Sequence, residues 1–528
     1  MQQSRRTSAT VAENQADVID FLSASGTHSG VPVERVDTHT AVVFLAGSCA
    51  WKLKRAVRYD YLDFSTVERR RILSEAEMRL NRRTAPALYR GVVPVTRARD
   101  GALAIGGSGT VVDWLLQMKR FDQEALFDRL AAEGKLELEL MAPLAREIAR
   151  FHRDAEPRRD HGGSAGMKWI IDGNAAGFAE HGAGVLPSAD GRRVTDETLA
   201  ELGRCGALLD ARRHAGFVRH CHGDLHLRNI VLLDGRPTLF DGIEFNDKLA
   251  CIDVWYDLAF LLMDLWRRQL PRHANAIFNG YLTETHDLDG VRLLPLFLSC
   301  RAAVRAKTSA TAARVQSTAT KVGELEQLAR EYLAMARDLL HPPSPSLVAI
   351  GGLSGSGKST LALALASSIA PVPGAVVLRS DEIRKELCGV EPLQPLGPEG
   401  YTPEISTRVY ETIVERARLA VGSGQSAIVD AVHARPADRN AIERVATSAS
   451  VRFLGVWLDA AESTLVDRAR HRRLDPSDAD EAVVRMQRAQ DAGPIYWHRI
   501  DASRPPDRVL EEVERFTAES CRSRRGRS

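Results

Sequence analysis

The sequence predicts two successive domains: an α+β domain of two lobes, and then an α/β domain with a parallel sheet in a three-layer arrangement. Three observations indicate this. Short apolar strands precede a long helical region, the segment HPPSPS carries three prolines in six residues, and an apolar strand directly after it enters a glycine-rich turn. Prolines remove backbone donors and favour an extended spacer. The expected segments are a disordered N-terminus at 1–14, domains at 15–340 and 347–517, the linker 341–346 between them, and a basic tail at 518–528.

Length and composition narrow the class of protein. At 528 residues the chain is too long for one ordinary core, and its 44% apolar and 27% charged residues are typical of a globular protein. A net charge of +2 argues against a dedicated nucleic-acid binder. Seven cysteines without paired or metal-binding spacing favour free thiols. Because the sequence shows neither a membrane helix nor a signal peptide, we expect a cytoplasmic protein without a membrane partner.

Two lysines are expected on one strand face of the first lobe. The segments 33–36, 41–45 and 50–57 have the apolar pattern of strands. Lys52 and Lys54 are two residues apart on the third of these, so both side chains project from the same face.

The next segment predicts a helix that carries a partner for these lysines. The helix is expected over 66–83, with an apolar stripe at Ile72, Ala76 and Leu80. Glu77 lies at the edge of that stripe, and a carboxylate that faces the protein requires a cation. A strand lysine paired with a helix glutamate is the arrangement that binds the α- and β-phosphates of ATP in protein kinases.

A hinge is expected between the two lobes. The remaining strands are predicted at 92–93 and 110–114, and a helical pattern covers 123–214. The segment 116–121, which includes Met118, is predicted to present backbone groups to adenine.

The stretch His222–Asn246, HGDLHLRNIVLLDGRPTLFDGIEFN, carries the central motif of the chain. It places Asp224 five positions ahead of Asn229, and Asp241 follows after a strand–turn–strand interval. Phosphoryl transfer from ATP requires a base that orients the acceptor hydroxyl and two oxygen ligands for magnesium. A lone Asp or Asn is usually a turn former or a helix cap, but this ordered set is far more specific. It predicts a phosphoryl-transfer site.

Other polar residues nearby favour structural roles. Asp253 and Asp257 lie near a helix start, where carboxylates commonly cap backbone amides. Arg301, Arg305 and Lys307 form a basic cluster on a later helix. On the charge pattern alone, a solvated helix face is favoured over a contact with an anionic substrate.

A second nucleotide site follows the proline-rich segment. The apolar strand 347–350 enters the sequence GLSGSGKST, which is a complete G-x-x-x-x-G-K-S motif followed by a helix. Its backbone amides converge on phosphate oxygens, Lys358 bridges the β- and γ-phosphates, and the Ser359 hydroxyl binds magnesium. The residues expected to hold the nucleotide are Gly352, Ser354, Gly355, Ser356, Gly357, Lys358, Ser359 and Thr360.

Further candidates follow the later strands. The strands 375–378 and 427–429 lead to Asp381 and Asp430, and open α/β sheets place ligand groups at such carboxyl ends. Arg384 lies three residues after Asp381 and shares its helix face. Arg468 and Arg472, one turn apart on the helix 462–473, are candidates for a lid over the transferring phosphate, and a solvated basic helix remains the alternative.

Residues 30–340 resemble the aminoglycoside phosphotransferase and choline-kinase-like branch of the kinase fold. The carriers are AWKLKRAV, SEAEMRLNRR, HGDLHLRN and LFDGIEFN. The resemblance implies Asp224 as the catalytic base, Asn229 and Asp241 as magnesium ligands, and either Lys52 or Lys54 as the partner of Glu77. Because no G-x-G-x-x-G loop precedes the lysines, the segment 37–40 must cover the phosphates in a less typical way.

Residues 346–515 resemble the P-loop kinases that include gluconate kinase, zeta-toxin-like sugar kinases and the kinase domain of polynucleotide kinase. The carriers are GLSGSGKST, RSDEIRKEL, IVDAVHAR and DRARHRR. The resemblance implies Asp381 as the base, Arg384 as a substrate contact and an AAA-like ATP-binding domain. The order of the two domains resembles that of fused bacterial aminoglycoside phosphotransferase and ATP-binding proteins.

The sequence therefore predicts a kinase with two ATP- and magnesium-binding domains. We expect it to transfer the γ-phosphate to a hydroxyl of a small molecule such as a sugar or an amino sugar. One alternative is that one domain is catalytic and the other is a regulatory ATP-binding module. Another, phosphorylation of nucleic-acid ends, is disfavoured by the near-neutral charge and few interleaved aromatics. The basic cluster at 301–307 argues against a polycationic aminoglycoside, and the oligomeric state stays open.

Overall fold

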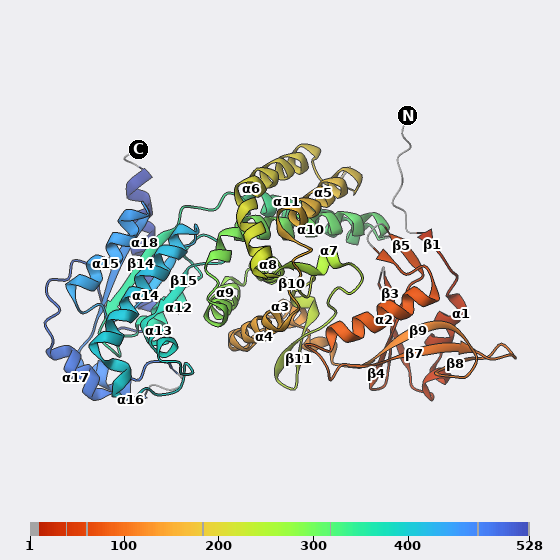
Figure 1. Ribbon diagram of the computed structural model, residues 1–528, viewed down its shortest axis with the longest axis horizontal. Helices are drawn as coiled ribbons and strands as arrows, with labels where there is room; N and C mark the ends of the chain where they lie inside the picture. Colours follow the sequence, from red (N-terminus) through yellow and green to blue (C-terminus); the bar gives the residue numbers. More distant parts are fainter. Residues whose placement is uncertain are drawn as a thin grey trace. The chain divides into compact units, whose positions relative to one another are not determined.

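The protein is described by a computed structural model that covers residues 10–38, 40–59, 62–181, 184–316, 318–471 and 475–525 (Figure 1). The chain forms two compact units, Met1–Asp264 and Leu265–Ser528, which divide inside helix α8 (Val254–Arg267). The expected linker at 341–346 therefore lies within the second unit. Helices α9 (Pro271–Thr285), α10 (Leu294–Val315) and α11 (Ala319–Leu339), which the sequence predicts for the first domain, belong to the second unit.

The first unit begins with an antiparallel sheet of strand order β2-β3-β4-β9-β7-β8. Its strands are β2 (Val33–Asp37), β3 (Ala41–Ala46), β4 (Cys49–Lys54), β7 (Tyr89–Arg97), β8 (Leu103–Ile105) and β9 (Thr110–Lys119). Helix α1 (Ala16–Ser23) precedes the sheet, and helix α2 (Val67–Asn81) packs against β7 and β9. This is the small lobe that the sequence predicts.

The N-terminal segment is more ordered than expected. Strand β1 (Thr10–Val11) pairs with β5 (Val57–Tyr59), which also pairs with β6 (Leu62–Asp63). The Glu13 carboxylate lies 2.7 Å from the buried guanidinium of Arg70. The predicted disorder at 1–14 is therefore wrong for 10–14, because these residues find backbone and ion-pair partners, and residues 1–9 lie outside the described part of the chain.

The buried face of α2 differs from the predicted apolar stripe. The hydroxyl of Thr66 accepts a hydrogen bond from the backbone N–H of Arg69 and starts the helix. Ile72 is 49% exposed, so its place in the stripe is wrong. The side chains of α2 that face the protein are instead mostly polar, because the surface opposite them carries charged partners. The buried residues of α2 are Arg70, Ser74, Glu77, Leu80 and Asn81.

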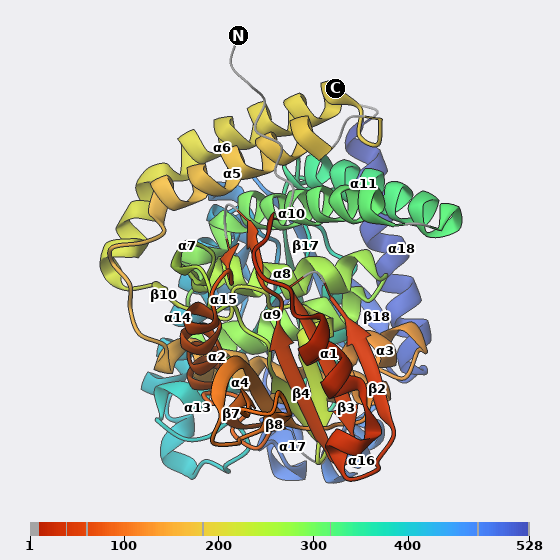
Figure 2. The same cartoon turned by 90° about the vertical axis from the view of Figure 1, so that its right-hand side faces the viewer.

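The second lobe is helical around a short β-region. Its helices are α3 (Phe127–Ala132), α4 (Met141–Asp154), α5 (Gly163–His181), α6 (Ser188–Ala215), α7 (Asp247–Ala250) and the first part of α8. Figure 2 shows α5 and α6 lying side by side. Strand β10 (Val218–His220) pairs with β13 (Cys251–Asp253), and β11 (Ile230–Leu233) forms a hairpin with β12 (Arg236–Leu239). The central motif lies on the segments between these strands.

The second unit contains a parallel sheet of strand order β15-β16-β14-β17-β18. Its strands are β14 (Ser346–Gly352), β15 (Val376–Arg379), β16 (Ala427–Asp430), β17 (Arg452–Asp459) and β18 (His498–Asp501). Helix α12 (Lys358–Ala366) packs with α18 (Pro506–Arg525), and α14 (Pro403–Gly422) packs with α15 (Pro436–Ser448). The sheet, with helices packed against it, confirms the predicted α/β class. Helices α13 (Ser380–Leu387), α16 (Glu462–His471) and α17 (Glu481–Ala489) complete this part.

The basic cluster on α10 is not the solvated face that the charge pattern favoured. Arg301 is only 5% exposed, and the guanidinium of Arg305 lies 5.6 Å from the ring centre of Tyr332 on α11. Burial lowers the pKa of Lys307. The sequence argument against a polycationic acceptor assumed that these cations line the acceptor pocket, and it stays a prediction.

Within the described residues, the helices fall short of the length and apolar character that a membrane span requires.

Candidate active sites

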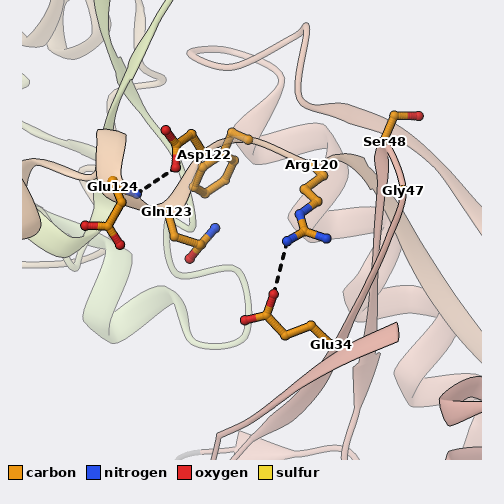
Figure 3. Close-up of a pocket in the computed structure, with 8 residues that line it drawn as sticks. Glu34, Gly47, Ser48, Arg120, Asp122, Gln123 and Glu124 are labelled. Carbon is orange, nitrogen blue, oxygen red and sulfur yellow. Dashed lines mark hydrogen bonds and ion pairs between the residues drawn. The ribbon is translucent and has the colours of Figure 1, made fainter. Parts of the chain in front are cut away.

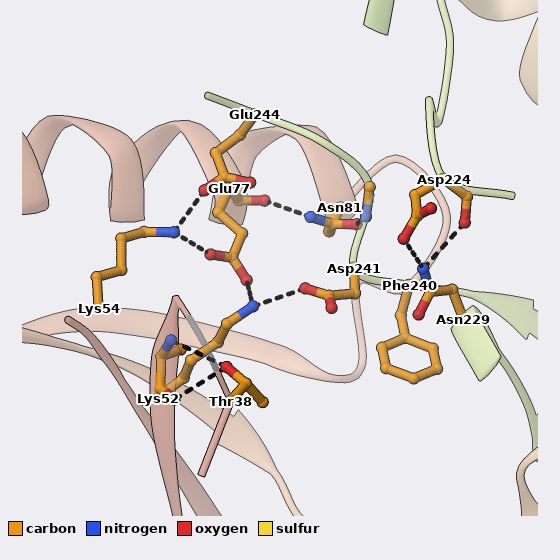
Figure 4. A network of polar contacts seen from close by, with 12 residues as sticks. Thr38, Lys52, Lys54, Glu77, Asn81, Asp224, Asn229, Phe240, Asp241 and Glu244 are labelled. Atoms are coloured by element: carbon orange, nitrogen blue, oxygen red, sulfur yellow. Dashed lines mark hydrogen bonds and ion pairs between the residues drawn. The ribbon is translucent and has the colours of Figure 1, made fainter. Parts of the chain in front are cut away.

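Lys52 and Lys54 bind the same carboxylate of α2 (Figure 4). The Nζ atom of Lys52 lies 2.7 Å from Oε1 of Glu77, and Nζ of Lys54 lies 2.6 Å from Oε2. The Glu77 side chain is 1% exposed. The two lysines share a strand face, as the period of two along β4 predicts. Glu77 is therefore held at the centre of the buried face and not at its edge.

Each lysine has a second carboxylate partner after β12. Lys52 Nζ lies 2.6 Å from Oδ1 of Asp241, and Lys54 pairs with Glu244. The sequence analysis missed Glu244, although its place three residues after Asp241 in LFDGIEFN was a usable signal. The result is a chain of alternating charges that joins β4, α2 and the segment after β12.

The alternating charges shift the ionisation of the shared carboxyl. Burial disfavours its charged form, but the ammonium groups of Lys52 and Lys54 outweigh burial and lower the pKa of Glu77 to about 2. Glu77 is therefore ionised at neutral pH. Burial, opposed by the nearby Lys54, raises the pKa of Glu244.

The two lysines differ in their access to solvent. The Lys52 side chain is 17% exposed, and its partner Asp241 is 44% exposed. The Lys54 side chain is 3% exposed, its partner Glu244 is 6% exposed, and its ammonium lies 4.7 Å from the ring centre of Phe64. Lys52 is thus the lysine at the open side of the network, and Lys54 is an internal cation.

The loop that follows β10 orients the candidate base. The amide Nδ2 of Asn229 donates to the backbone carbonyl and to Oδ2 of Asp224, both at 2.9 Å. Because the nitrogen of the amide faces Asp224, its oxygen is left for a cation. Asp224 is 39% exposed on its side chain, as a group that receives a substrate must be.

The buried carboxylate of Asp257 fixes the start of this loop through hydrogen bonds to its backbone. Its carboxylate accepts hydrogen bonds from the backbone N–H groups of His222 and Gly223 at 3.0 and 2.9 Å, and it contacts His152 Nε2 at 3.1 Å. The sequence predicted that Asp253 and Asp257 cap backbone amides near the start of their own helix. The Asp253 carboxylate does accept a hydrogen bond from the backbone N–H of Trp255. Asp257 instead caps the amides of the catalytic loop.

Asn81 ties the segment that carries Asp241 to α2. Its Oδ1 accepts the backbone N–H of Gly242 at 2.8 Å, and its Nδ2 donates to the carbonyl of Glu77 at 2.9 Å. Asp241 has a positive φ of 61°, a conformation that non-glycine residues rarely adopt. The hydroxyl of Tyr89 accepts its backbone N–H at 3.1 Å. Carboxylate and amide oxygens at Asp241 and Asn229 suit magnesium, so the residues fit this ion.

A hollow lies beside the connection between the lobes (Figure 3). It has a volume of about 500 Å³, and Arg120 and Glu34 face one another across it at 3.0 Å. The predicted hinge is too long, because β9 continues through Lys119 and Met118 packs in the core at 8% exposure. The lining residues are Glu34, Gly47, Ser48, Arg120, Phe121, Asp122, Gln123 and Glu124.

The predicted P-loop is formed in the second unit, between β14 and α12. Gly355 and Gly357 have φ values of 82° and 89°, which favour glycine. A Cβ atom on Gly355 would also lie 2.4 Å from the carbonyl oxygen of Leu465. Lys358 Nζ donates to the Leu353 carbonyl at 3.1 Å, and the Ser359 hydroxyl donates to Oδ2 of Asp430 at 2.6 Å. The structure thus brings together the serine and carboxylate that the sequence assigned to magnesium.

Arg379 is a site residue that the sequence analysis missed. Its guanidinium contacts Asp430 at 3.4 Å, Glu382 at 2.8 Å and Asp475 at 3.1 Å. These partners raise its pKa although burial opposes them. A charged residue at the end of an apolar strand, directly before Ser380, was the available signal. Arg379 sets the position of the Asp430 carboxylate.

The two α13 candidates have different surroundings. Asp381 makes no side-chain hydrogen bond or ion pair with any residue in the described part of the chain, so its carboxylate is available to an acceptor. Arg384 is 9% exposed, donates to the Gly400 carbonyl at 2.8 Å and lies against the ring of Tyr401. Arg384 is thus partly committed to internal contacts.

The lid candidates are described only in part. Arg468 donates to the backbone carbonyl of Ala502 at 2.8 Å, and Arg472 lies outside the described residues. The sequence analysis also missed Gln487 on α17, whose Oε1 accepts the backbone N–H of Ser354 in the P-loop at 2.9 Å. No spacing signal connects Gln487 with a loop so far away in the sequence.

The buried imidazole of His433 should make the free energy of unfolding depend on pH. It is 1% exposed, and burial, together with the charges of Lys358 and Arg439, lowers its pKa from 6.5 to about 3. Below pH 6.5 the imidazole of His433 is therefore protonated in the unfolded chain, whereas in the folded chain it stays neutral until the pH approaches 3. The contribution of His433 to the free energy of unfolding is complete above pH 6.5 and decreases as the pH drops toward 3. At pH 5 this contribution has fallen by about 2 kcal/mol.

Urea denaturation at pH 7 and pH 5 measures this change. His433 has a φ of 51°, which asparagine tolerates. We expect His433→Asn to lose less stability than the wild type between the two pH values. Equal losses in the two proteins would contradict the assignment.

Comparison with known proteins matches both sites to kinase families. A family model described as "Phosphotransferase enzyme family" matches residues 65–294, and one described as "AAA domain" matches residues 347–494. The uncharacterized protein Rv2004c of Mycobacterium tuberculosis is 31% identical over 489 residues, which cover 90% of this chain and 94% of that protein. The chain belongs to this two-domain family. It is an ATP-dependent kinase.

Solved structures resemble the kinase one domain at a time. A gluconokinase from Sinorhizobium meliloti shares 22% identity over 35% of this chain and 98% of its own, with a TM-score of 0.27. A choline/ethanolamine kinase family protein from Mesorhizobium loti shares 13% identity over 62% of this chain and 95% of its own, with a TM-score of 0.40.

Proposed function

We propose that the kinase has two phosphoryl-transfer centres, each of which uses ATP and Mg²⁺ to phosphorylate a hydroxyl of a small molecule such as a sugar or an amino sugar. The observation that supports the proposal is that each unit contains its own set of lysine, carboxylate and neutral oxygen groups that suit the roles of phosphate contact, base and magnesium ligand. In the first unit these are Asp224, Lys52, Asn229 and Asp241, and in the second they are Asp381, Lys358, Ser359 and Asp430.

In the first centre, Lys52 holds the α- and β-phosphates and Asp224 orients the acceptor hydroxyl. Asn229 and Asp241 would hold magnesium, which would neutralise charge on the phosphates when bound. Asp224 accepts the proton of the attacking hydroxyl, and the nearby Asn229 amide keeps its carboxylate in place. Glu77 keeps Lys52 extended toward the phosphates.

In the second centre, the amides of the P-loop and Lys358 hold the β- and γ-phosphates. Ser359 and Asp430, which contact one another, would hold magnesium in this centre. Asp381 orients the acceptor hydroxyl, and Arg384 and Arg468 lie on the helices that flank the site. Burial raises the pKa of Asp430, while Lys358 and Arg379 oppose this change.

Exchanging each lysine for methionine separates their roles. We expect Lys52→Met to lower the turnover of the first centre and to leave a folded protein, because Glu77 keeps Lys54. We expect Lys54→Met to destabilise the first unit by about 3–5 kcal/mol, because it leaves the buried carboxylate of Glu244 without its cation and leaves Glu77 with Lys52 alone. Thermal unfolding and the kcat and KM for ATP measure the two effects.

A double variant provides the matched control. Replacing Lys54 and Glu244 together by apolar residues removes the uncompensated charge, so Lys54→Met with Glu244→Leu should recover part of the stability. Equal effects of the two single variants on turnover and stability would contradict the separate roles.

A screen with labelled ATP and a panel of sugars, amino sugars and other hydroxylated metabolites tests the proposed function. Wild type, Asp224→Ala and Lys358→Ala should each phosphorylate a different subset of acceptors. If one variant abolishes all transfer while the other changes only ATP affinity, the domain that carries the latter variant is a regulatory ATP-binding module. If neither variant changes any activity, the proposal fails.

A further inference from the structure

The strand that leads to Asp381 lies at the edge of the parallel sheet. Strand β15 pairs with β16 on one side, where the Val376 N–H donates to the carbonyl of Ser426 at 2.8 Å. Because backbone groups alternate along a strand, the neighbours Ala375 and Val377 direct theirs to the outer edge. Buried edge groups require partners from outside the sheet.

Helix α9 lies beside β15 (Figure 1), and its side chains supply those partners. The Val377 N–H donates to Oδ1 of Asn279 at 2.7 Å, and Nδ2 of Asn279 donates to the carbonyl of Ala375 at 3.1 Å. A backbone N–H only donates, so the amide oxygen must face Val377 and the nitrogen must face Ala375. One side-chain amide thus makes the two bonds that a residue of a neighbouring parallel strand would make.

A second amide secures the start of the same strand. Nδ2 of Asn275, one turn earlier on α9, lies 3.1 Å from the Ala375 carbonyl and 3.3 Å from that of Pro373. Asn275 is 4% exposed. A Cβ atom on Gly374 would lie 2.6 Å from Asn275 Nδ2, and Gly374 has a φ of 109°, so this approach requires glycine.

The position of β15 decides where the site residues lie. Arg379 ends the strand, two residues after Val377, and contacts Asp430, the partner of Ser359. Asp381 follows on α13. A shift of β15 would therefore displace both the candidate base and the cation that holds the candidate magnesium ligand.

We infer that α9 is the edge element of the P-loop sheet and that Asn275 and Asn279 are positioning residues of the second centre. Both lie outside the matched AAA domain at 347–494, and α9 falls within the phosphotransferase match at 65–294. The centre is therefore completed by a helix of the preceding family domain. The expected effect on turnover rests on the proposed function, whereas the contact with β15 does not.

Hydrogen exchange and kinetics on full-length Asn279→Ala test this inference. Loss of one hydrogen bond should speed exchange of the Val377 amide about tenfold and loosen the segment 376–382. With the first centre silenced by Asp224→Asn, kcat of the second centre should fall about tenfold or more, because a small misplacement is costly. The KM for ATP should stay within about twofold, since the P-loop itself is untouched.

Two variants of α9 serve as references. Thr283→Ala removes a hydroxyl that bonds the Asn279 carbonyl within the helix, and it should change neither readout. Asn279→Asp keeps the acceptor for Val377 and removes the donor for Ala375, so exchange of the Val377 amide should stay nearer to that of the wild type.

The outcomes separate the inference from the proposed function. Unchanged exchange at Val377 in Asn279→Ala overturns the role of α9, whatever the turnover. Faster exchange with a kcat equal to that of Thr283→Ala overturns the positioning role. If the wild-type second centre shows no turnover, the proposed function fails there, and the exchange of 376–382 alone decides the role of α9.

Discussion

Asp224→Asn should lower phosphoryl transfer by the first centre about 10²–10⁴-fold, because the substitution removes the proton acceptor. Asparagine has the same shape, so the loop held by Asp257 and Asn229 should keep its conformation. The KM for ATP should change little, since the substitution leaves Lys52, the proposed phosphate contact, and Asp241, a proposed magnesium ligand, in place. The measurement is the kcat and KM for ATP with an acceptor of the first centre.

A matched control for Asp224→Asn is available on the same lobe. Asp234 lies in the hairpin between β11 and β12 and has a φ of 48° that asparagine tolerates. Asp234→Asn makes the same chemical change outside the site and should leave turnover unchanged. Equal losses in both variants, or a full rate in Asp224→Asn, would remove Asp224 from its role as base.

Lys358→Met should lower phosphoryl transfer by the second centre about 10²–10³-fold, because it removes the cation that is proposed to stabilise the developing charge on the phosphates. The positive φ values of Gly355 and Gly357 do not depend on the lysine side chain, so the loop should retain its fold. Transfer by the first centre should be unaffected. ATP binding and turnover by each centre, measured with its own acceptor, test this expectation.

The control for Lys358→Met is Lys385→Met in the same domain. Lys385 is buried and pairs with Asp478 and not with the P-loop. Its loss should reduce stability more than Lys358→Met does, because it leaves Asp478 without this cation. A Lys358→Met protein that transfers phosphate at the wild-type rate would show that the second domain does not use its P-loop for catalysis.

Local patterns were sufficient to predict the fold and to single out most of the candidate site residues. The glycine-rich turn after an apolar strand and the spacing of Asp224, Asn229 and Asp241 are set by short-range chemistry. A P-loop needs glycine where φ is positive, as at Gly355 and Gly357, and this requirement is visible in any single sequence.

Pattern reasoning failed where the partner surface was charged. The expected stripe on α2 assumed that apolar side chains face inward, yet Ile72 is 49% exposed while Glu77 and Arg70 are buried. Helical periodicity finds a buried face only when the surface opposite is apolar. Here that surface presents Lys52 and Lys54, so a polar face is the one that packs.

The sequence by itself determined two kinase-type domains and the residue types that phosphoryl transfer would require, because strands, loops and motifs depend on neighbours along the chain. The choice of Lys52 over Lys54 as the proposed phosphate contact came only from the tertiary structure. So did the pairing of Lys54 with Glu244, the contact of Arg379 with Asp430, and the amides of α9 on β15. Each of these joins segments that are far apart in sequence, and only folding sets the distance and burial that give such contacts their energy.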